Sequence, residues 1–260
     1  MEKETLSPTK KNFQKFEKLN GIISRIRDIF FPENLTCACC GADLYADQPF
    51  CPHCLKELPF NHGFICDKCG RSIKEDYPVC LECKANMPAF DMARSSFRYE
   101  GELVRLIKEF KTGGKYLASV FAEYMYTYVL AQFSDADFAV FVPMTEKDEK
   151  KRGYNQSELL AEKVCERSGL KLEREIIVKT RETGAQKELT RKERAENMEG
   201  SFRVHNRVAC RGKNILIIDD VLTTGATAGA LAKTLYGAGA DKVYLLTIAS
   251  VMDKRENAVK

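Results

Sequence analysis

The sequence predicts an α/β protein with a doubly wound parallel sheet, preceded by a small cysteine-rich module. Two observations predict the sheet. Apolar segments of strand length alternate with segments of helix length from about Ala89 onward, and one strand segment is apolar at four consecutive positions. A third observation sets the first part apart, because nine of the 11 cysteines lie between Cys37 and Cys83. We therefore expect an N-terminal tail with an amphipathic helix at 1–36, the cysteine-rich module at 37–88 and the α/β domain at 89–260.

The individual elements follow from hydrophobic periodicity and from the positions of glycine and proline. In the α/β domain we expect helices at 102–111, 116–133, 156–168 and 227–236, and strands at 92–99, 138–142, 170–178, 215–218 and 243–249. The charged stretch 181–200 has few large apolar residues, which predicts a mobile loop with a helical portion. Near the N-terminus, 13–30 carries apolar residues at helical spacing. Such a helix can lie on a membrane surface, but packing on its own protein is favoured.

The composition is that of an ordinary globular protein. The 260 residues include 41 basic and 37 acidic side chains, 44 % are hydrophobic, and the formal net charge is +4. This small excess permits contact with nucleic acid or phosphate without requiring it. No segment is long and apolar enough for a transmembrane span, and the charged N-terminus lacks the apolar core of a secretory signal. We therefore expect a cytoplasmic protein.

The cysteine-rich segment is an internal repeat. Two C-x2-C pairs separated by ten residues recur with an offset of 29 residues, and a glycine follows the first pair of each unit. A dense cluster in a chain without an export signal indicates metal rather than disulfides, and four thiolates in paired knuckles suit structural zinc. Either each unit closes its own site or the two are interleaved, and neither arrangement leaves an open position for catalysis. The expected zinc ligands are Cys37, Cys40, Cys51 and Cys54 in the first unit and Cys66, Cys69, Cys80 and Cys83 in the second.

Basic and aromatic residues accompany the cysteines, among them Lys68, Arg71, Lys84, Phe64 and Tyr77. Such side chains can bind single-stranded nucleic acid through attraction to its backbone and stacking on its bases. They can also form the small core and the solvated edge of a metal-bound domain. From the residues alone this second interpretation is favoured.

The most informative segment runs from Ile215 to Thr227 and reads ILIIDDVLTTGAT. Its apolar start predicts a strand buried on both faces, with two carboxylates at the carboxyl end, where ligands bind in open α/β sheets. The following turn is rich in hydroxyls and glycine and opens a helix, so it can present backbone N–H groups to a phosphate. Asp219 and Asp220 would repel a phosphate, but they suit the hydroxyls of a ribose and positive charge developing at its anomeric carbon. A helix cap alone would not need two adjacent acids followed by Thr-Thr-Gly-Ala-Thr, so we favour the interpretation as a ligand site.

These thirteen residues match the ribosyl-phosphate signature of type I phosphoribosyltransferases. The wider pattern resembles the ComF family, competence-associated proteins that join a zinc ribbon to such a domain. Besides the cysteine repeat and the signature, the residues that carry this resemblance are Arg152-Gly153-Tyr154-Asn155-Gln156, Gln186, Arg194 and Asn197. The resemblance implies a type I phosphoribosyltransferase-like fold in which Asp219 and Asp220 hold the ribose of a phosphoribosyl metabolite. The phosphoribosyl-binding segment that it implies continues through Val221, Leu222, Thr223, Thr224, Gly225, Ala226 and Thr227.

The resemblance also implies Mg²⁺, bound mainly through the pyrophosphate and hydroxyl oxygens of the ligand. It implies a role in natural transformation, in which the protein handles single-stranded DNA together with competence and recombination proteins. Two other functions stay open at this point. One is a catalytically active phosphoribosyltransferase with an unknown acceptor, and the other is a ligand-responsive regulator of nucleotide metabolism.

A pyrophosphate group needs cations or backbone donors around it. Arg152 is the best candidate, because it lies between a strand and a helix at the expected ligand-binding edge and a guanidinium can bind two oxygens at once. With Asp219 and Asp220 it forms the expected catalytic set. Nearby acidic residues make this segment less suited to an intact pyrophosphate. Further candidates for contact with the pyrophosphate are Lys108 and Lys111, which face either the site or water, and Arg194 in the charged loop.

Overall fold

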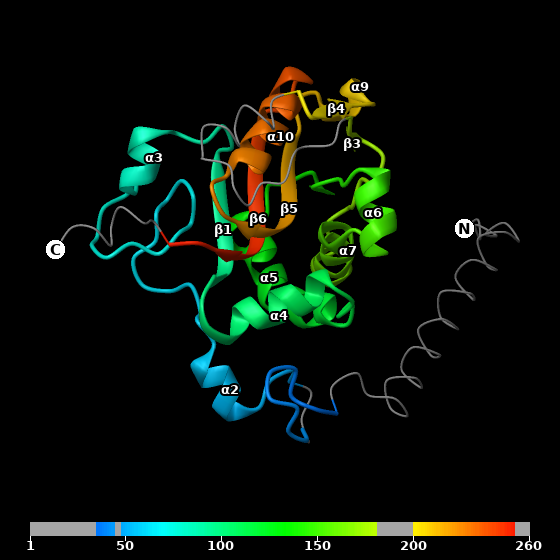
Figure 1. Ribbon diagram of the computed structural model, residues 1–260. Helices are drawn as coiled ribbons and strands as arrows, with labels where there is room; N and C mark the ends of the chain where they lie inside the picture. The colour runs from blue at the N-terminus through cyan, green and yellow to red at the C-terminus, as the bar shows by residue number, and fades with distance from the viewer. Residues whose placement is uncertain (1–34, 45–47, 181–199, 253–260) are drawn as a thin grey trace, which may run out of the picture. The chain divides into compact units, whose positions relative to one another are not determined.

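The computed structural model describes residues 35–44, 48–180 and 200–252 (Figure 1). The chain divides into two compact units at the junction of Lys56 and Glu57. The helix expected at 13–30 and the charged stretch that contains Arg194 lie outside the described residues.

A parallel sheet of four strands forms the centre of the second unit. Its order is β1, β6, β5, β2, and every neighbouring pair is parallel. The strands span Met92–Arg98, Lys242–Ser250, Asn214–Leu222 and Phe138–Phe141 in that order. Strand β5 has a neighbouring strand on each edge, and its four consecutive apolar residues, 215–218, are buried on both faces of the sheet. The predicted parallel α/β class is confirmed.

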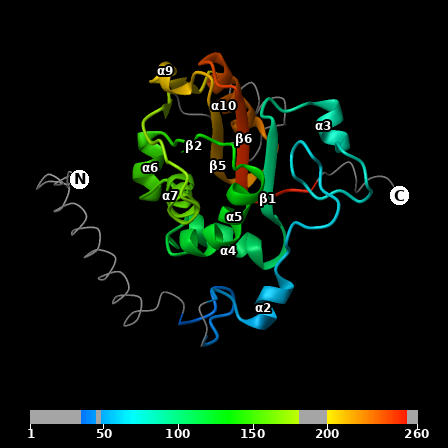
Figure 2. The same ribbon diagram turned by 180° about the vertical axis from the view of Figure 1, so that it is seen from behind.

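Helices cover both faces of this sheet (Figures 1 and 2). Alternate side chains of a strand point to opposite faces. Ile215 and Ile217 of β5 share a buried cluster with apolar residues of α10, which spans Ala226–Gly237. The opposite face carries α5, Leu117–Gln132, and α7, Gln156–Ser168. Helix α4, Gly101–Lys111, follows β1, and its buried stripe includes Leu103 and Phe110.

Three expectations about individual elements are corrected. The segment 143–156 lies between the expected strand and helix, and no element was expected in it. It contains helix α6, Glu146–Arg152, which has no apolar face and was missed for that reason. Its acidic first turn, basic last turn and Thr145 cap stabilise it instead. The strand expected at 170–178 is interrupted: Leu172 forms a single parallel bridge with Ala139 of β2. The regular strand is β3, Ile177–Lys179, which pairs with β4, Phe202–Val204, in a separate antiparallel sheet. Strand β5 extends beyond Ile218, because its pairing with β6 continues to Leu222.

The remaining short helices are α2, Pro52–Glu57, α3, Leu81–Ala85, and α9, Arg207–Cys210. Helix α3 belongs to the second cysteine repeat, which lies wholly in the second unit. All four cysteines of that repeat are buried in the same apolar cluster as Ile217 and Leu235. The second repeat is thus part of the core of the α/β unit.

Edge strand β1 is bound to this second repeat by backbone and side-chain contacts. The Ala93 N–H donates to the Lys68 carbonyl at 2.8 Å, and Arg94 Nη1 donates to the Asp67 carbonyl at 3.0 Å. Gly70 lies so close to the strand that an added Cβ would come within 2.3 Å of the Ala93 oxygen. Only glycine allows this approach, and its φ of +66° also favours glycine.

Candidate functional site

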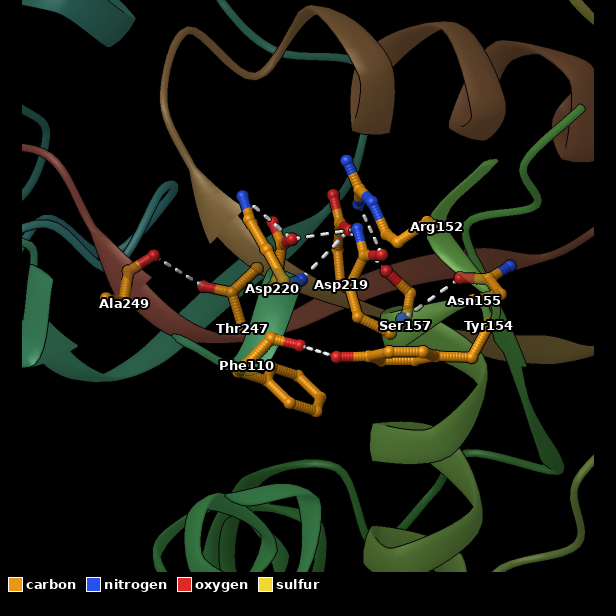
Figure 3. Close-up of polar contacts among 11 residues, drawn as sticks. Phe110, Arg152, Tyr154, Asn155, Ser157, Asp219, Asp220, Thr247 and Ala249 are labelled. Atoms are coloured by element: carbon orange, nitrogen blue, oxygen red, sulfur yellow. Dashed lines mark hydrogen bonds and ion pairs between the residues drawn. The ribbon is translucent and has the colours of Figure 1, made fainter. Parts of the chain in front are cut away.

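The two acidic residues lie at the carboxyl end of β5, opposite the start of α7 (Figure 3). Asp219 Oδ1 accepts hydrogen bonds from Ser157 Oγ at 2.8 Å and from the Asp220 N–H at 2.9 Å. Asp220 Oδ2 accepts from Gln156 Nε2 at 3.0 Å and forms an ion pair with Lys111 Nζ at 2.9 Å. The pair is therefore held by groups from three separate elements.

The environment of the acidic pair favours uptake of a proton. Removal from water raises the pKa of Asp219 to about 7, and repulsion by the Asp220 carboxylate acts in the same direction. The Ser157 hydroxyl, the Asp220 N–H and the charge of Lys111 act in the opposite direction. A carboxyl group with a pKa near neutrality can bind or release a proton at physiological pH.

Arg152 ends helix α6 and reaches the acidic pair through one intermediary. Its Nη1 donates to Gln156 Oε1 at 2.5 Å, and the amide of the same Gln156 donates to Asp220. The guanidinium itself is exposed, which leaves its other donors available to a ligand. Gly153 adopts a φ of +87° and ends the helix, so the chain can turn directly into α7.

The turn between α6 and α7 is fixed by two buried side chains. The Asn155 carboxamide caps α7 by accepting from the Ser157 N–H at 3.0 Å, and it donates to the Val142 carbonyl at 3.1 Å. The Tyr154 hydroxyl donates to the Phe110 carbonyl and accepts from the Gly113 N–H at 3.2 Å. These contacts join the end of α4 to the start of α7 and thereby hold Lys111 beside the acidic pair.

The predicted phosphate loop, residues 223–227, follows β5 and includes the first two residues of α10. Gly225 has a φ of +79° and precedes the first helical residue, so the first N–H groups of a 12-residue helix open at this loop. The Thr224 hydroxyl accepts from the Ala226 N–H at 3.3 Å. A Cβ at Gly225 would make only ordinary contacts, so its positive φ is what favours glycine.

The remaining cation candidates differ in their placement. Lys111 contacts Asp220, whereas Lys108 is exposed on α4, and its carbonyl accepts from the Thr112 hydroxyl. Arg194 lies outside the described residues. The contacts of Ser157 and of Tyr154 were missed from the sequence. The signal for Ser157 is its position directly after a capping Asn and Gln.

The two cysteine repeats each gather four sulfur atoms within 4.8 Å of one another. Sulfur atoms around a tetrahedral zinc with Zn–S bonds of about 2.3 Å are about 3.8 Å apart. Cys40 and Cys51 have their Sγ atoms 3.8 Å apart, and those of Cys69 and Cys80 are 3.7 Å apart. Backbone N–H groups also point at the sulfurs, as from Cys80 to Cys66 at 3.3 Å. The chain therefore contains two four-cysteine sites that fit zinc.

The basic and aromatic residues of the cysteine-rich segment fall into two groups. Phe50 is buried, and Phe60 packs on Phe97 with ring centroids 4.9 Å apart. Arg71 is buried as well, whereas Phe64 is 50 % exposed. Lys84 lies over the Tyr77 ring at 5.3 Å. Most of these side chains thus contribute to packing, and Phe64 is the exposed aromatic among those described.

The fold and site define a class of protein: a parallel α/β domain in which an acidic pair and a threonine- and glycine-containing turn follow one central strand, preceded in the chain by two four-cysteine zinc ribbons. Residues 26–85 match the family described as the double zinc ribbon domain. DNA utilization protein YhgH of Escherichia coli strain K12 is 34 % identical over 112 residues, which are 42 % of this chain and 48 % of that protein. Competence protein F of Haemophilus influenzae is 26 % identical over 42 % of this chain and 48 % of its own length.

These matches confirm the resemblance to the ComF family, and the chain spans about half the length of the curated relatives it matches. Among solved structures, a hypoxanthine phosphoribosyltransferase from Staphylococcus aureus aligns with a TM-score of 0.34 and 12 % identity. That alignment covers 52 % of this chain and 64 % of the other.

Proposed function

We propose that this protein binds a 5'-phosphoribosyl ligand, either phosphoribosyl pyrophosphate or a nucleotide, at the carboxyl end of β5. The observation that carries the proposal is the placement of an acidic pair directly before the loop that opens α10. Ribose hydroxyls donate hydrogen bonds to carboxylates, whereas phosphates accept them from N–H groups. Along the chain, the two carboxylates that suit ribose hydroxyls come first, and the N–H groups that suit the 5'-phosphate follow at the start of α10.

The surrounding cations support a ligand with further negative charge. Lys111 already contacts Asp220, and the exposed guanidinium of Arg152 lies one side chain away. In the proposed complex Arg152 contacts the pyrophosphate or the corresponding part of a nucleotide. Mg²⁺ would be held mainly by oxygens of the ligand, bound beside Asp219 and Asp220, and would offset the charge of the pyrophosphate.

Isothermal titration tests this proposal directly. Phosphoribosyl pyrophosphate with Mg²⁺ is titrated into the wild type and into the Asp219→Asn/Asp220→Asn double variant. The variant keeps the size of both side chains and removes both acceptor charges. We expect binding to the wild type and a loss of at least about tenfold in the variant, since charged hydrogen bonds to two ribose hydroxyls are removed.

Asp241→Asn is the matched control. Asp241 is exposed and precedes β6, so it lies at the amino ends of the parallel strands, opposite the carboxyl ends where the site lies. Its replacement removes one carboxylate without touching the site and should leave the affinity unchanged. Absence of binding to a zinc-loaded, folded wild type would overturn the proposal for phosphoribosyl pyrophosphate, and the same titration with a nucleoside 5'-monophosphate decides the nucleotide alternative.

The wider role that we propose is the handling of single-stranded DNA during DNA uptake. The names of the relatives, a DNA utilization protein and a competence protein, support this role. The side chain of Phe64 in the second ribbon is half exposed and can stack on a base in the proposed complex.

Transfer of the phosphoribosyl group to an acceptor is the second candidate function. The raised pKa of Asp219 favours it, because this carboxyl can accept a proton near neutral pH.

A further inference from the structure

Arg71 of the second zinc ribbon reaches the phosphate loop. Its side chain is 3 % exposed, and its Nη2 donates to the backbone carbonyl of Thr223, 152 residues further along the chain. Within the described part of the chain, the Nε–H of Arg71 has no hydrogen-bond partner, and the guanidinium group forms no ion pair with a carboxylate. A buried guanidinium in this position needs an explanation, because burying a charge without an anionic partner is unfavourable.

The contact with Thr223 determines the orientation of one peptide group. The carbonyl and the following N–H of a trans peptide point in opposite directions. While the Thr223 carbonyl points to Arg71, the N–H of Thr224 points away from Arg71. The opposite orientation would present a carbonyl oxygen to the phosphate and repel it. The hydrogen bond from Arg71 therefore selects the orientation that offers a donor.

The backbone around Arg71 is held by the zinc knuckle itself. The Arg71 carbonyl accepts from the N–H of Cys66, an expected zinc ligand, at 2.9 Å, and the Gly70 N–H donates to the Cys66 carbonyl at 2.8 Å. On the other side, Asn61 donates to the Gly70 carbonyl at 2.6 Å and accepts from the Ser72 hydroxyl at 2.6 Å. The position of the guanidinium thus depends on the closed knuckle.

Charge balance points to the same arrangement. Four thiolates around one Zn²⁺ carry a net negative charge, so the second zinc site provides one anionic neighbour for Arg71. A phosphate bound at the loop would provide another. The guanidinium would then lie between two anionic groups, which offsets the cost of burying it.

We propose that Arg71 is a positioning residue through which the second zinc ribbon sets the affinity of the loop for the 5'-phosphate. This inference rests on the proposed function, since it concerns the same phosphate loop. It makes the second ribbon a part of the ligand site.

The test compares Arg71→Met and Arg71→Lys with Arg94→Met. Arg94 is a matched control, because it is also a buried arginine that joins the second ribbon to β1, by its bond to the Asp67 carbonyl. Binding of ribose 5-phosphate and, separately, of inorganic pyrophosphate is measured for each variant. Zinc content and melting temperature are measured on the same samples.

We expect Arg71→Met to weaken binding of ribose 5-phosphate at least about tenfold, because one buried charged hydrogen bond is lost. Binding of pyrophosphate should stay unchanged. Arg71→Lys should restore part of the affinity, because lysine keeps one charged donor. Arg94→Met should bind ribose 5-phosphate as the wild type does.

Equal weakening by the Arg71 and Arg94 variants would overturn the inference, because it would indicate a general effect of loosening the ribbon. So would wild-type affinity in a zinc-loaded Arg71→Met protein. If Arg71→Met fails to fold, Arg71→Lys is compared with the wild type. Weaker binding of ribose 5-phosphate by Arg71→Lys supports the inference, and wild-type affinity overturns it. Failure of the wild type itself to bind ribose 5-phosphate would instead overturn the proposed function.

Discussion

At the scale of single residues, the acidic pair of β5 shows how an environment changes the chemistry of a common side chain. Asp219 and Asp220 are adjacent, and both are removed from most of the solvent. Ser157 contacts one oxygen of Asp219, and Gln156 and Lys111 contact one oxygen of Asp220. Burial and the neighbouring charge of Asp220 nevertheless raise the pKa of Asp219 to about 7, so this carboxyl is partly protonated near neutral pH.

The raised pKa of Asp219 predicts how stability depends on pH. Its folded-state pKa of about 7 lies above the ordinary value of 3.8, so ionisation of this group disfavours the folded state. Its contribution to stability is fully present below pH 4 and is lost as the pH rises through 7. Asp219→Asn should therefore be more stable than the wild type at pH 8, by an amount on the scale of about 1.4 kcal/mol per pKa unit.

Chemical denaturation of the wild type and Asp219→Asn at pH 5 and pH 8 measures this difference. At pH 5 the two free energies of unfolding should approach each other, because the carboxyl of the wild type is then protonated. An advantage of the variant that is the same at both pH values would contradict the assignment of the raised pKa to Asp219.

At the scale of elements, the knuckles of the two zinc ribbons are equivalent in sequence but different in surroundings. Gly41 and Gly70 follow the first cysteine pair of their repeats, with φ values of +74° and +66°. A Cβ at Gly41 would meet nothing within 4 Å, whereas one at Gly70 would collide with the carbonyl of Ala93 in β1. The same motif is thus an open turn in the first repeat, whereas in the second repeat it packs against β1.

Alanine substitutions at these two glycines separate the two effects. Gly41→Ala should cost only about 1–2 kcal/mol, the penalty of a left-handed conformation for a residue with a side chain. Gly70→Ala should cost several kcal/mol more, because β1 or the knuckle must move to relieve the overlap. Melting temperatures of both variants at saturating zinc give the comparison. Equal losses would show that the close approach to β1 contributes little.

At the scale of the whole molecule, the chain has a small positive net charge of +4. Among the residues that the structure describes, no helix has the length and apolarity needed to cross a membrane. Because the net charge is small, electrostatic attraction to DNA should be modest, and stacking on an exposed aromatic side chain should add to it. Phe64 of the second ribbon has the exposure that stacking requires.

Binding of a fluorescent single-stranded oligonucleotide, measured at several salt concentrations, tests the proposed contact with DNA. We expect affinity to fall as salt rises, and Phe64→Ala to weaken binding by about 1–3 kcal/mol, the usual contribution of one stacked base. Leu130→Ala is the control, because Leu130 is an exposed apolar residue of α5. The same weakening in both variants, or none in either, would remove Phe64 from the proposed DNA surface.

The amino-acid sequence by itself determined the features that depend on residues close together in the chain. The spacing of the C-x2-C pairs predicted two four-cysteine sites that fit zinc, and the apolar run and the following turn predicted a buried strand, an acidic pair at its carboxyl end and a helix after it. Such patterns are local, because one knuckle or one strand end sets the distances between their members. Helix α6 is local too, but hydrophobic periodicity does not reveal it, because caps and charges rather than an apolar face stabilise it.

Only the tertiary structure decided which distant side chains complete the site. Lys111 could face either water or the acids until the packing of α4 against the α6–α7 turn brought it to Asp220. Arg71 belonged to a basic, aromatic segment that could form either a nucleic-acid surface or, in the favoured interpretation, the core and edge of the ribbon, and the structure buries it against Thr223. The physical reason is the same for both. A contact between residues far apart in the chain depends on how whole elements pack, and no local pattern records that packing.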